Sequence, residues 1–516
     1  MPGWSRFTQF RVVLWAVLAG AVAFLFYARS AGSEFVYDAR PQVLFGDYIH
    51  EPSHWGEVLS FRVLGQDVLD ANRPVQLASL MLDSALWGRN PVGYHLTSAA
   101  LHAANVALLF LLLMELGGGR AGPALLAALA FAVHPMLVEP VAEVSSREDV
   151  LTLFFLLLAM LLALRCGRST GRAMWWTGAG CVAASLLAVG AKETGVIAPV
   201  LVGACGVLFR ERGTGRRWLV VTALAALVVG GFVAARFAFE PRESMIFLQK
   251  PGRLGGSLVE TLKLQPRIWG FYVRQIFWPV ELSAIYTPQN VARVASGWLY
   301  VMLAALVLVQ GVAAWRSRVG LLGMLMYWAA MGPVSNLLPM YCPAADRYLY
   351  VPLAGLALTV FALLAWVRAG ARAWPYVAAG CGVVLTALAW LGWQRQEVFA
   401  DSFNLWTDTV AKSPASDNAA NNLGYAWLRK GDNAKALAAF ERALQLTNGR
   451  KADAWAGAAI ALDRMGRPSD AVRALRRAVE IMPIYGNPDQ LVKSLVAEPA
   501  DAEAWREIRS HAVIDP

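Results

Sequence analysis

The sequence predicts an all-α protein in two parts, a polytopic membrane bundle with about eleven spans followed by a soluble helical domain. Of its 516 residues, 57% are hydrophobic and only 16% are charged, whereas soluble proteins carry about 25% charged residues. Apolar runs close to the roughly 20 residues that cross a bilayer recur along most of the chain. After Trp393 the composition becomes polar and a helical repeat begins. We therefore place the membrane domain at 1–393 and the soluble domain at 394–516.

The apolar runs define the spans in order along the chain. The first run has short basic flanks and no small-residue cleavage site, so we expect a retained span and not a cleaved signal peptide. The expected spans lie near residues 10–28, 96–115, 121–137, 150–164, 174–190, 194–209, 218–236, 298–315, 320–338, 348–367 and 374–393.

The arginines predict the orientation of these spans. If the N-terminus lies inside, every short loop on that side is basic, in agreement with the positive-inside rule. The net charge of +10 therefore reflects topology, and no nucleic-acid partner is expected. The loop arginines are Arg120, Arg165, Arg168, Arg172, Arg210, Arg212, Arg216, Arg217, Arg316, Arg318, Arg368 and Arg372.

An odd number of spans places the C-terminus and the polar segments on the outer, extracytoplasmic side. The segment 265–290 then cannot be a simple crossing, and its charges predict an interfacial or re-entrant helix. A conventional span is the alternative, and it would put the C-terminus inside. The expected outer segments are 29–95, 134–149, 191–193, 238–297, 333–347 and the chain after about 394.

Small and aromatic residues recur in the soluble domain at a fixed period. Ala436 and Ala471 hold equivalent positions, close to the roughly 34-residue period of a tetratricopeptide repeat. Stacked repeats form a concave face that binds peptides, so a protein partner is expected, with a ligand-free structural cap as the alternative. The first set is Asn422, Leu423, Gly424, Trp427, Gly431, Ala436, Phe440 and Ala443; the second is Trp455, Ala459, Gly466, Ala471, Leu475, Ala478 and Pro483.

Ionisable residues at the mouths of spans mark a candidate site, because charges at membrane depth are costly and usually functional. His134 and Glu139 could suggest a metal, but no HExxH helix and no third ligand at suitable spacing accompany them. The five cysteines have no CxxC spacing either. No metal site is predicted. His95, at the mouth of the second span, is a further site candidate.

Two cations on the outer side suit an anionic ligand. Lys192 is either directed at an anion or neutralised by Glu193 beside it. Arg347 follows Asp346 at the mouth of a span, where a guanidinium can contact a phosphate through two donors. Tyr348 next to it could equally be a residue of the aromatic belt.

Several segments, taken in order, resemble those of one family, the transmembrane and tetratricopeptide repeat (TMTC-type) O-mannosyltransferases with their bacterial relatives, within the GT-C class of glycosyltransferases. Each motif is weak alone, but the set covers nearly the whole chain in the family's order. Terminal tetratricopeptide repeats complete the set. The segments are Phe35-Val36-Tyr37-Asp38, Asn72-Arg73-Pro74-Val75, Pro91-Val92-Gly93-Tyr94-His95, His134-Pro135 to Arg147, Ala191-Lys192-Glu193, Ser335-Asn336 and Asp346-Arg347-Tyr348-Leu349-Tyr350.

The resemblance implies a GT-C-like enzyme that transfers a sugar from a polyprenyl phosphate to a hydroxyl, with protein serine or threonine as the expected acceptor. The expected partners are membrane lipid, the lipid-linked sugar and a protein acceptor. No cofactor is predicted, and a divalent metal is left open. The expected location is a bacterial inner membrane, with a cytoplasmic N-terminus and periplasmic repeats.

The family pattern also implies site roles. The catalytic carboxylate maps onto Asp38, which would accept the proton of the acceptor hydroxyl. Fixed cations would stabilise the leaving phosphate; Arg347 and Lys192 are the first choices, followed by Arg73 and Arg147. The expected supporting residues are Asp47, His95, His134, Glu139, Glu193, Asp346 and Tyr348.

The chain departs from the family at one position. The family commonly has two adjacent acids, whereas this chain has Asp38-Ala39, with Asp47 as the nearest substitute. Ala39 favours an alternative function, a non-catalytic membrane scaffold whose repeats recruit partners for envelope assembly. A second alternative is a lipid-linked glycan ligase that acts on polysaccharide.

Overall fold

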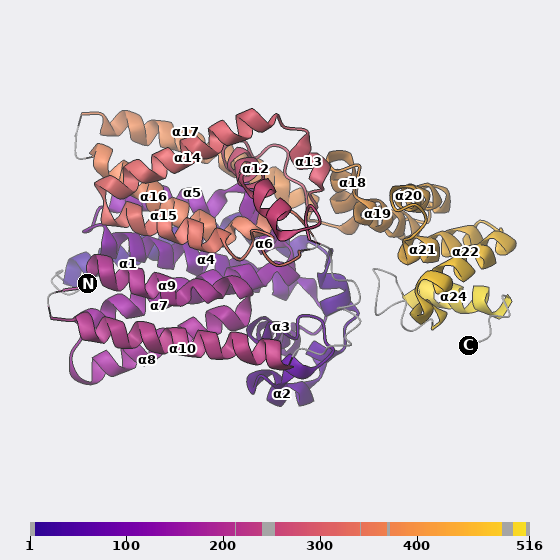
Figure 1. Ribbon diagram of the computed structural model, residues 1–516, viewed down its shortest axis with the longest axis horizontal. Coiled ribbons are helices and arrows are strands. Elements are labelled where there is room, and N and C mark those ends of the chain that lie inside the picture. The colour runs from indigo at the N-terminus through magenta and orange to yellow at the C-terminus, as the bar shows by residue number, and fades with distance from the viewer. Residues whose placement is uncertain are drawn as a thin grey trace.

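The protein is all-helical wherever its structure is described. Figure 1 shows a computed structural model, which describes residues 6–211, 213–239, 253–340, 342–368, 372–487 and 499–511. Within these ranges the chain forms helices and connecting segments and no strand. Arg212 of the predicted basic loops lies outside the described residues, as do residues 240–252 of the expected outer segment 238–297.

Each predicted span coincides with an apolar helix of the bundle. Within the described residues, eight helices are long and apolar enough to cross a membrane, and α5 with the bent continuation after it could make a ninth. The chain is therefore a multi-pass membrane protein. The helices are α1 (Arg6–Tyr27), α4 (Pro91–Leu116), α5 (Ala121–Val133), α7 (Arg147–Arg168), α8 (Gly171–Ala191), α9 (Ala198–Phe209), α10 (Gly215–Phe239), α14 (Ser296–Arg316), α15 (Arg318–Met331), α16 (Tyr350–Arg368) and α17 (Trp374–Val398).

The expected count of about eleven spans exceeds this number because two of the apolar helices are short. A 3₁₀ segment, Glu193–Ile197, takes up the first turn of the run that contains α9, and the run ends at Phe209. α15 has 14 residues, which corresponds to about 21 Å of helix against a hydrocarbon core of about 30 Å. Neither helix reaches full span length on its own.

The polar segments expected on the outer side gather at one end of the bundle. Figure 1 shows α2 (Trp55–Leu59), α3 (Pro74–Trp87), α6 (Val138–Ala142) and α13 (Pro288–Ala292) at the end that faces the C-terminal repeats. The N-terminus lies at the opposite end, at the left of the view. The segments predicted to carry the site are therefore close together in space.

The segment 265–290 differs from its prediction in extent. Its helix α12 runs from Leu258 to Phe277, is strongly amphipathic, and is not among the helices apolar enough to span. Its polar face carries Glu260, Lys263 and Arg267, and it packs against α14. The chain then turns at Trp278 and reaches the short helix α13.

The first outer segment is a small folded unit. After the turn at Tyr37 it forms a π-helical turn, Arg40–Leu44, several 3₁₀ turns and the helices α2 and α3. Apolar side chains from these elements build a separate core, which includes Phe35, Val58 and Leu80. This core fixes the segment on the end of the bundle.

The C-terminal region consists of antiparallel helix pairs, as predicted for tetratricopeptide repeats. Small residues allow close packing: an added Cβ at Gly457 would lie 2.2 Å from Phe440, and one at Gly424 would lie 2.5 Å from the same ring. The predicted domain boundary at Trp393 falls inside α17. The helices are α18 (Ser402–Lys412), α19 (Asp417–Arg429), α20 (Asn433–Leu446), α21 (Ala452–Arg464), α22 (Pro468–Ile481) and α24 (Pro499–His511).

Candidate active site

Asp38 lies in an unusual turn at the end of the bundle. Tyr37 before it has a left-handed backbone, φ +52°, which a bulky residue rarely adopts. The Asp38 side chain is exposed to solvent, yet protein surrounds it on other sides. Partial desolvation, with the nearby acids Asp70 and Glu148, raises its pKa to about 6, and Arg347 opposes this rise. Within the described residues the Asp38 carboxylate makes no hydrogen bond and no ion pair.

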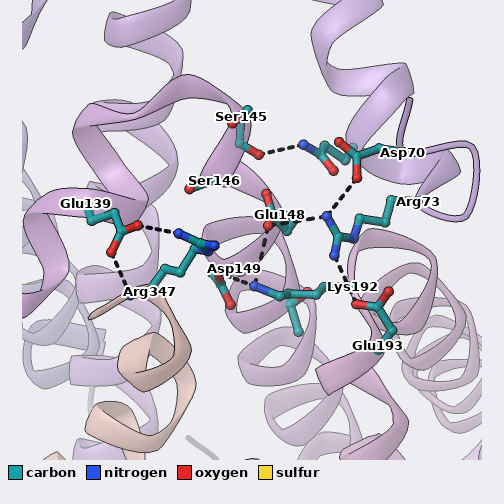
Figure 2. Close-up of polar contacts among 12 residues, drawn as sticks. Asp70, Arg73, Glu139, Ser145, Ser146, Glu148, Asp149, Lys192, Glu193 and Arg347 are labelled. Carbon is teal, nitrogen blue, oxygen red and sulfur yellow. Dashed lines mark hydrogen bonds and ion pairs between the residues drawn. The ribbon is translucent and has the colours of Figure 1, made fainter. Parts of the chain in front are cut away.

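Glu139 holds Arg347 in place by contacting one side of its guanidinium. Its Nη1 contacts Glu139 Oε1 at 2.5 Å and its backbone N–H donates to Glu139 Oε2 at 3.1 Å. The guanidinium lies 5.4 Å from the ring of Tyr348 and 5.9 Å from that of Tyr37. Nε and Nη2 have no hydrogen-bond partner in the described part of the chain, so Arg347 keeps donors for a ligand. Figure 2 shows the Glu139 pair.

Lys192 and Arg73 belong to a network of ion pairs (Figure 2). Lys192 Nζ lies 2.5 Å from Asp149 and 3.4 Å from Glu148. Arg73 contacts Asp70 at 2.8 Å, Glu193 at 3.4 Å and Glu148 at 3.5 Å. The self-neutralising alternative for Lys192 and Glu193 is wrong, because each pairs with other residues. Both cations are neutralised by carboxylates from several segments.

Glu193 has a second partner in the same network. Arg236, near the end of α10, lies 3.0 Å from Glu193 Oε1, and the amide of Asn72 donates to the same oxygen at 3.1 Å. Glu193 therefore joins the first outer segment to α10.

Arg147 does not fit a phosphate contact. Its side chain is fully buried and lies 2.6 Å from Asp83. Its other donors reach the hydroxyls of Ser98 and Ser79 and the carbonyl oxygen of Tyr94. These contacts tie α7 to α3 and α4, so we correct the prediction: Arg147 is a structural residue.

Asp47 and His95 have structural contacts of their own. Asp47 is exposed and pairs with Arg89 at 2.7 Å, so it does not replace the acid missing at Ala39. His95 is buried, stacks on Phe35 and contacts the carbonyl oxygen of Glu34 at 3.4 Å. It supports the segment that leads to Asp38.

Two further supporting residues, His134 and Asp346, connect their outer segments to the segment 238–297. His134 contacts the carbonyl oxygen of Ile276 at 3.1 Å through Nε2. Asp346 is buried and accepts a hydrogen bond from the hydroxyl of Tyr286 at 2.7 Å. In the described ranges, no group of three histidine, cysteine or acidic side chains is placed to hold a metal ion.

Glu143 is the main residue that the sequence did not assign. It is fully buried, and its carboxylate accepts the backbone N–H of Ala39 at 3.3 Å, of Ser145 at 3.1 Å and of Ser146 at 2.7 Å. Burial and the charge of Asp38 raise its pKa to about 8. An acid therefore binds the backbone at the position where the second acid of the family is missing.

Glu148, Asp149 and Asp70 were also not assigned, although they neutralise the predicted cations. The acidic pair after Arg147 at the start of a predicted span was the available signal, because two acids at membrane depth require cations nearby. Nothing in the sequence indicates that these cations are Lys192 and Arg73, since the partners come from distant segments.

Comparisons with known proteins agree with the predicted resemblance. A tetratricopeptide repeat family model matches residues 411–498. The protein O-mannosyl-transferase Tmtc1 of Drosophila melanogaster is 32% identical over 37% of this chain and 23% of its own. The human protein O-mannosyl-transferase TMTC4 is 32% identical over 28% of this chain and 22% of its own length. A protein O-mannosyl-transferase of Caenorhabditis elegans is 22% identical over 64% of this chain and 48% of its own length.

Solved structures give a more distant likeness. Crystal structures of ArnT from Cupriavidus metallidurans, bound to undecaprenyl phosphate and in the apo state, share 16% identity and align over 97% of this chain and 89% of theirs. Their TM-scores of 0.40 and 0.43 are too low to establish a common fold. The matches span less than half the length of each of the three relatives named above. The predicted resemblance is confirmed at this level: the chain is similar to TMTC-type proteins over part of its length, and it carries C-terminal tetratricopeptide repeats.

Proposed function

We propose that the protein is a membrane glycosyltransferase that moves a sugar from a polyprenyl-phosphate donor to a hydroxyl group, with protein serine or threonine as the acceptor. One observation carries the proposal: among the residues that the structure describes, Asp38 presents an exposed, unpaired carboxylate near Arg347, which keeps two donor groups for a ligand. A base beside a phosphate-binding cation is what such a transfer requires. The names of the relatives support a mannosyl donor.

Asp38 is the proposed general base. A hydroxyl is a weak nucleophile near neutral pH, so a positioned carboxylate must take its proton as the new bond forms. With its pKa raised to about 6, Asp38 is a stronger base than an ordinary aspartate and is still ionised near pH 7. One base and one direct displacement predict inversion at the anomeric carbon.

Arg347 is the proposed contact for the donor phosphate. The leaving group carries the charge that develops in the transition state, and a fixed guanidinium stabilises it through paired donors. Glu139 holds the opposite side of the guanidinium and so fixes its direction. Lys192 and Arg73 are paired with carboxylates, so their role is to balance the acids around the site.

The remaining parts of the proposal concern location and partners. The end of the bundle that carries Asp38 would face the outside, with the N-terminus in the cytoplasm of a bacterium and the repeats in the periplasm. The lipid tail of the donor would lie among the membrane helices. The repeats would bind the protein acceptor, and no cofactor takes part in the proposed reaction.

A matched pair of acid substitutions tests this function. The purified protein is supplied with polyprenyl-phosphate mannose and a hydroxyl acceptor, and sugar transfer is measured by mass spectrometry. Asp38→Asn should abolish transfer, because the amide cannot accept the proton. Asp47→Asn, on the exposed surface of the same segment, should leave transfer unchanged.

Two outcomes would contradict the proposal. Full transfer by Asp38→Asn would remove this residue from the mechanism. In cells, deletion of the gene should remove a hexose-sized mass from serine or threonine peptides of envelope proteins. If no protein changes, a loss of sugar from a surface glycan would favour the ligase, and no change at all would favour the scaffold.

A further inference from the structure

Trp406, in the middle part of α18, packs with the membrane domain. Its side chain is fully buried and belongs to the core of the helical bundle, together with Leu405 and Phe399. A separate core holds the later repeats. The indole N–H of Trp406 has no hydrogen-bond partner within the described residues. A buried, unpaired N–H is costly. At this position the packing of the indole ring therefore outweighs the cost of its missing hydrogen bond.

The ring that Trp406 packs against is Tyr37. The two ring centroids are 5.3 Å apart in an edge-to-face arrangement. Tyr37 has a left-handed backbone, and the Arg347 guanidinium lies 5.9 Å from the centroid of its ring. A strained backbone persists only where its surroundings fix it. Trp406 and Arg347 are therefore two of the neighbours that hold the residue directly before Asp38.

The chain just before α18 contacts the residues that lead into this turn. The backbone N–H of Glu34 donates to the carbonyl oxygen of Ala400 at 2.9 Å, and Arg29 forms an ion pair with Glu397. The amide of Gln396 donates to the carbonyl oxygen of Phe26 at 3.2 Å. The end of α17 thus clamps the segment that leads to Asp38.

A polar seam joins α18 to the segment that carries Arg347. Arg395 is buried and lies 2.9 Å from Asp408 of α18 and 3.7 Å from Asp346. Lys412 donates to the carbonyl oxygen of Leu282 at 2.9 Å, and Ser413 donates to that of Ile285 at 2.7 Å. Both proposed site residues are therefore next to residues that α17 and α18 hold.

We propose that α18 forms one wall of the active site and that Trp406 is a positioning residue for Asp38. This inference rests on the proposed function, because it assigns Trp406 a role in the same reaction. It predicts that loss of α18 contacts slows transfer to any acceptor, including one too small to touch the repeats. Acceptor recognition by the repeats would then be a separate property of α19 and the helices after it.

The test compares two tryptophans in the full-length protein. Trp406→Leu removes the ring against Tyr37, whereas Trp455→Leu removes a tryptophan whose indole donates to Gly449 within the repeats. With a small hydroxyl acceptor, Trp406→Leu should lower kcat by about 10- to 100-fold with little change in the acceptor KM, as expected for a misplaced base. Trp455→Leu should change neither value, and Trp406→Phe should restore most of the activity.

Hydrogen exchange gives a second readout that needs no activity. Backbone amides of residues 34–42 should exchange faster in Trp406→Leu and at the wild-type rate in Trp455→Leu. If Trp406→Leu does not fold, Lys412→Ala removes the contacts with Leu282 and Asp408 from a partly exposed position. It should lower kcat and speed exchange near Leu282.

The outcomes separate the two proposals. Wild-type kcat with unchanged exchange in Trp406→Leu, or in Lys412→Ala where that variant replaces it, would overturn the role of α18. A wild-type protein without transfer to any acceptor would overturn the proposed function. Faster exchange at 34–42 in that case would still show that α18 holds the turn.

Discussion

At the residue scale, the site is defined by which charges are paired and which are not. Lys192, Arg73 and Arg147 all have carboxylate partners, while among the described residues Arg347 keeps part of its guanidinium free and Asp38 has no partner. A charge that is left accessible among many paired ones is available to a ligand. In the proposed reaction these two residues would carry the chemistry, and the surrounding ion pairs would set its electrostatic background.

The pKa of Asp38 predicts how transfer depends on pH. Because the surrounding protein raises this pKa to about 6, the carboxylate is protonated and inactive as a base below pH 6. Transfer should therefore increase as the pH rises from 5 to 7, with an apparent pKa near 6 in kcat/KM. An ordinary aspartate would give an apparent pKa near 4 in this profile. An apparent pKa at that value would contradict the assignment of Asp38 as the base.

Glu143 predicts a pH dependence of stability. Its folded-state pKa is raised to about 8, so its favourable contribution is present below the unfolded value and is lost as the pH rises through 8. Glu143→Gln cannot ionise. The thermal midpoint of the wild type relative to Glu143→Gln should therefore fall between pH 6 and pH 9. A difference that is constant with pH would show that Glu143 does not titrate in this range.

The buried and the accessible arginine should respond differently to substitution. Arg147→Gln leaves Asp83 buried without its charge partner, so the membrane domain should lose about 3–5 kcal/mol of stability, measured by thermal or denaturant unfolding in detergent. Arg347→Gln also leaves a buried carboxylate, that of Glu139, without its charge partner, so it should cost stability too. Per folded molecule, however, it should reduce transfer far more than Arg147→Gln does. Equal transfer by the folded fractions of both variants would contradict the division into structural and site residues.

At the element scale, apolar periodicity predicted the helices well and their ends poorly. Each expected span coincides with a helix because hydrophobic length is visible in a single segment. The number of full-length spans was overestimated because the 3₁₀ segment before α9 and the short α15 depend on tertiary packing. The start of α12 at Leu258 and the extension of α17 beyond Trp393 were missed for the same reason.

The candidate site was predictable only in part, because many of its contacts join segments that are far apart in the sequence. Asp38 and Arg347 could be found because their motifs resemble those of a known family. The pairing of Lys192 with Asp149, and the position of Glu143 beside Ala39, depend on how separate loops meet in space. A single sequence shows which residues are costly to bury, but it does not show which residues neutralise them.

At the scale of the whole molecule, two cores meet at α19. The bundle core includes Trp406, Ala419 and Ala426, and the repeat core includes Ala420 and Tyr425. Damage confined to the repeat core should therefore leave the bundle folded. Under the proposed function, this arrangement would separate chemistry at the end of the bundle from recognition of a large acceptor by the repeats.

A substitution deep in the repeats tests that separation. At Gly457 an added Cβ would lie 2.2 Å from the ring of Phe440. Gly457→Val should therefore overpack the repeat core and lower the stability of the repeats by about 1–3 kcal/mol. Transfer to a protein acceptor should fall, while transfer to a small hydroxyl acceptor continues at the wild-type rate. Gly380→Ala, where an added Cβ meets no atom within 4 Å, is the control and should change neither rate. If Gly457→Val lowers both rates equally, the repeats are part of the catalytic unit, and the division at α18 would have to be abandoned.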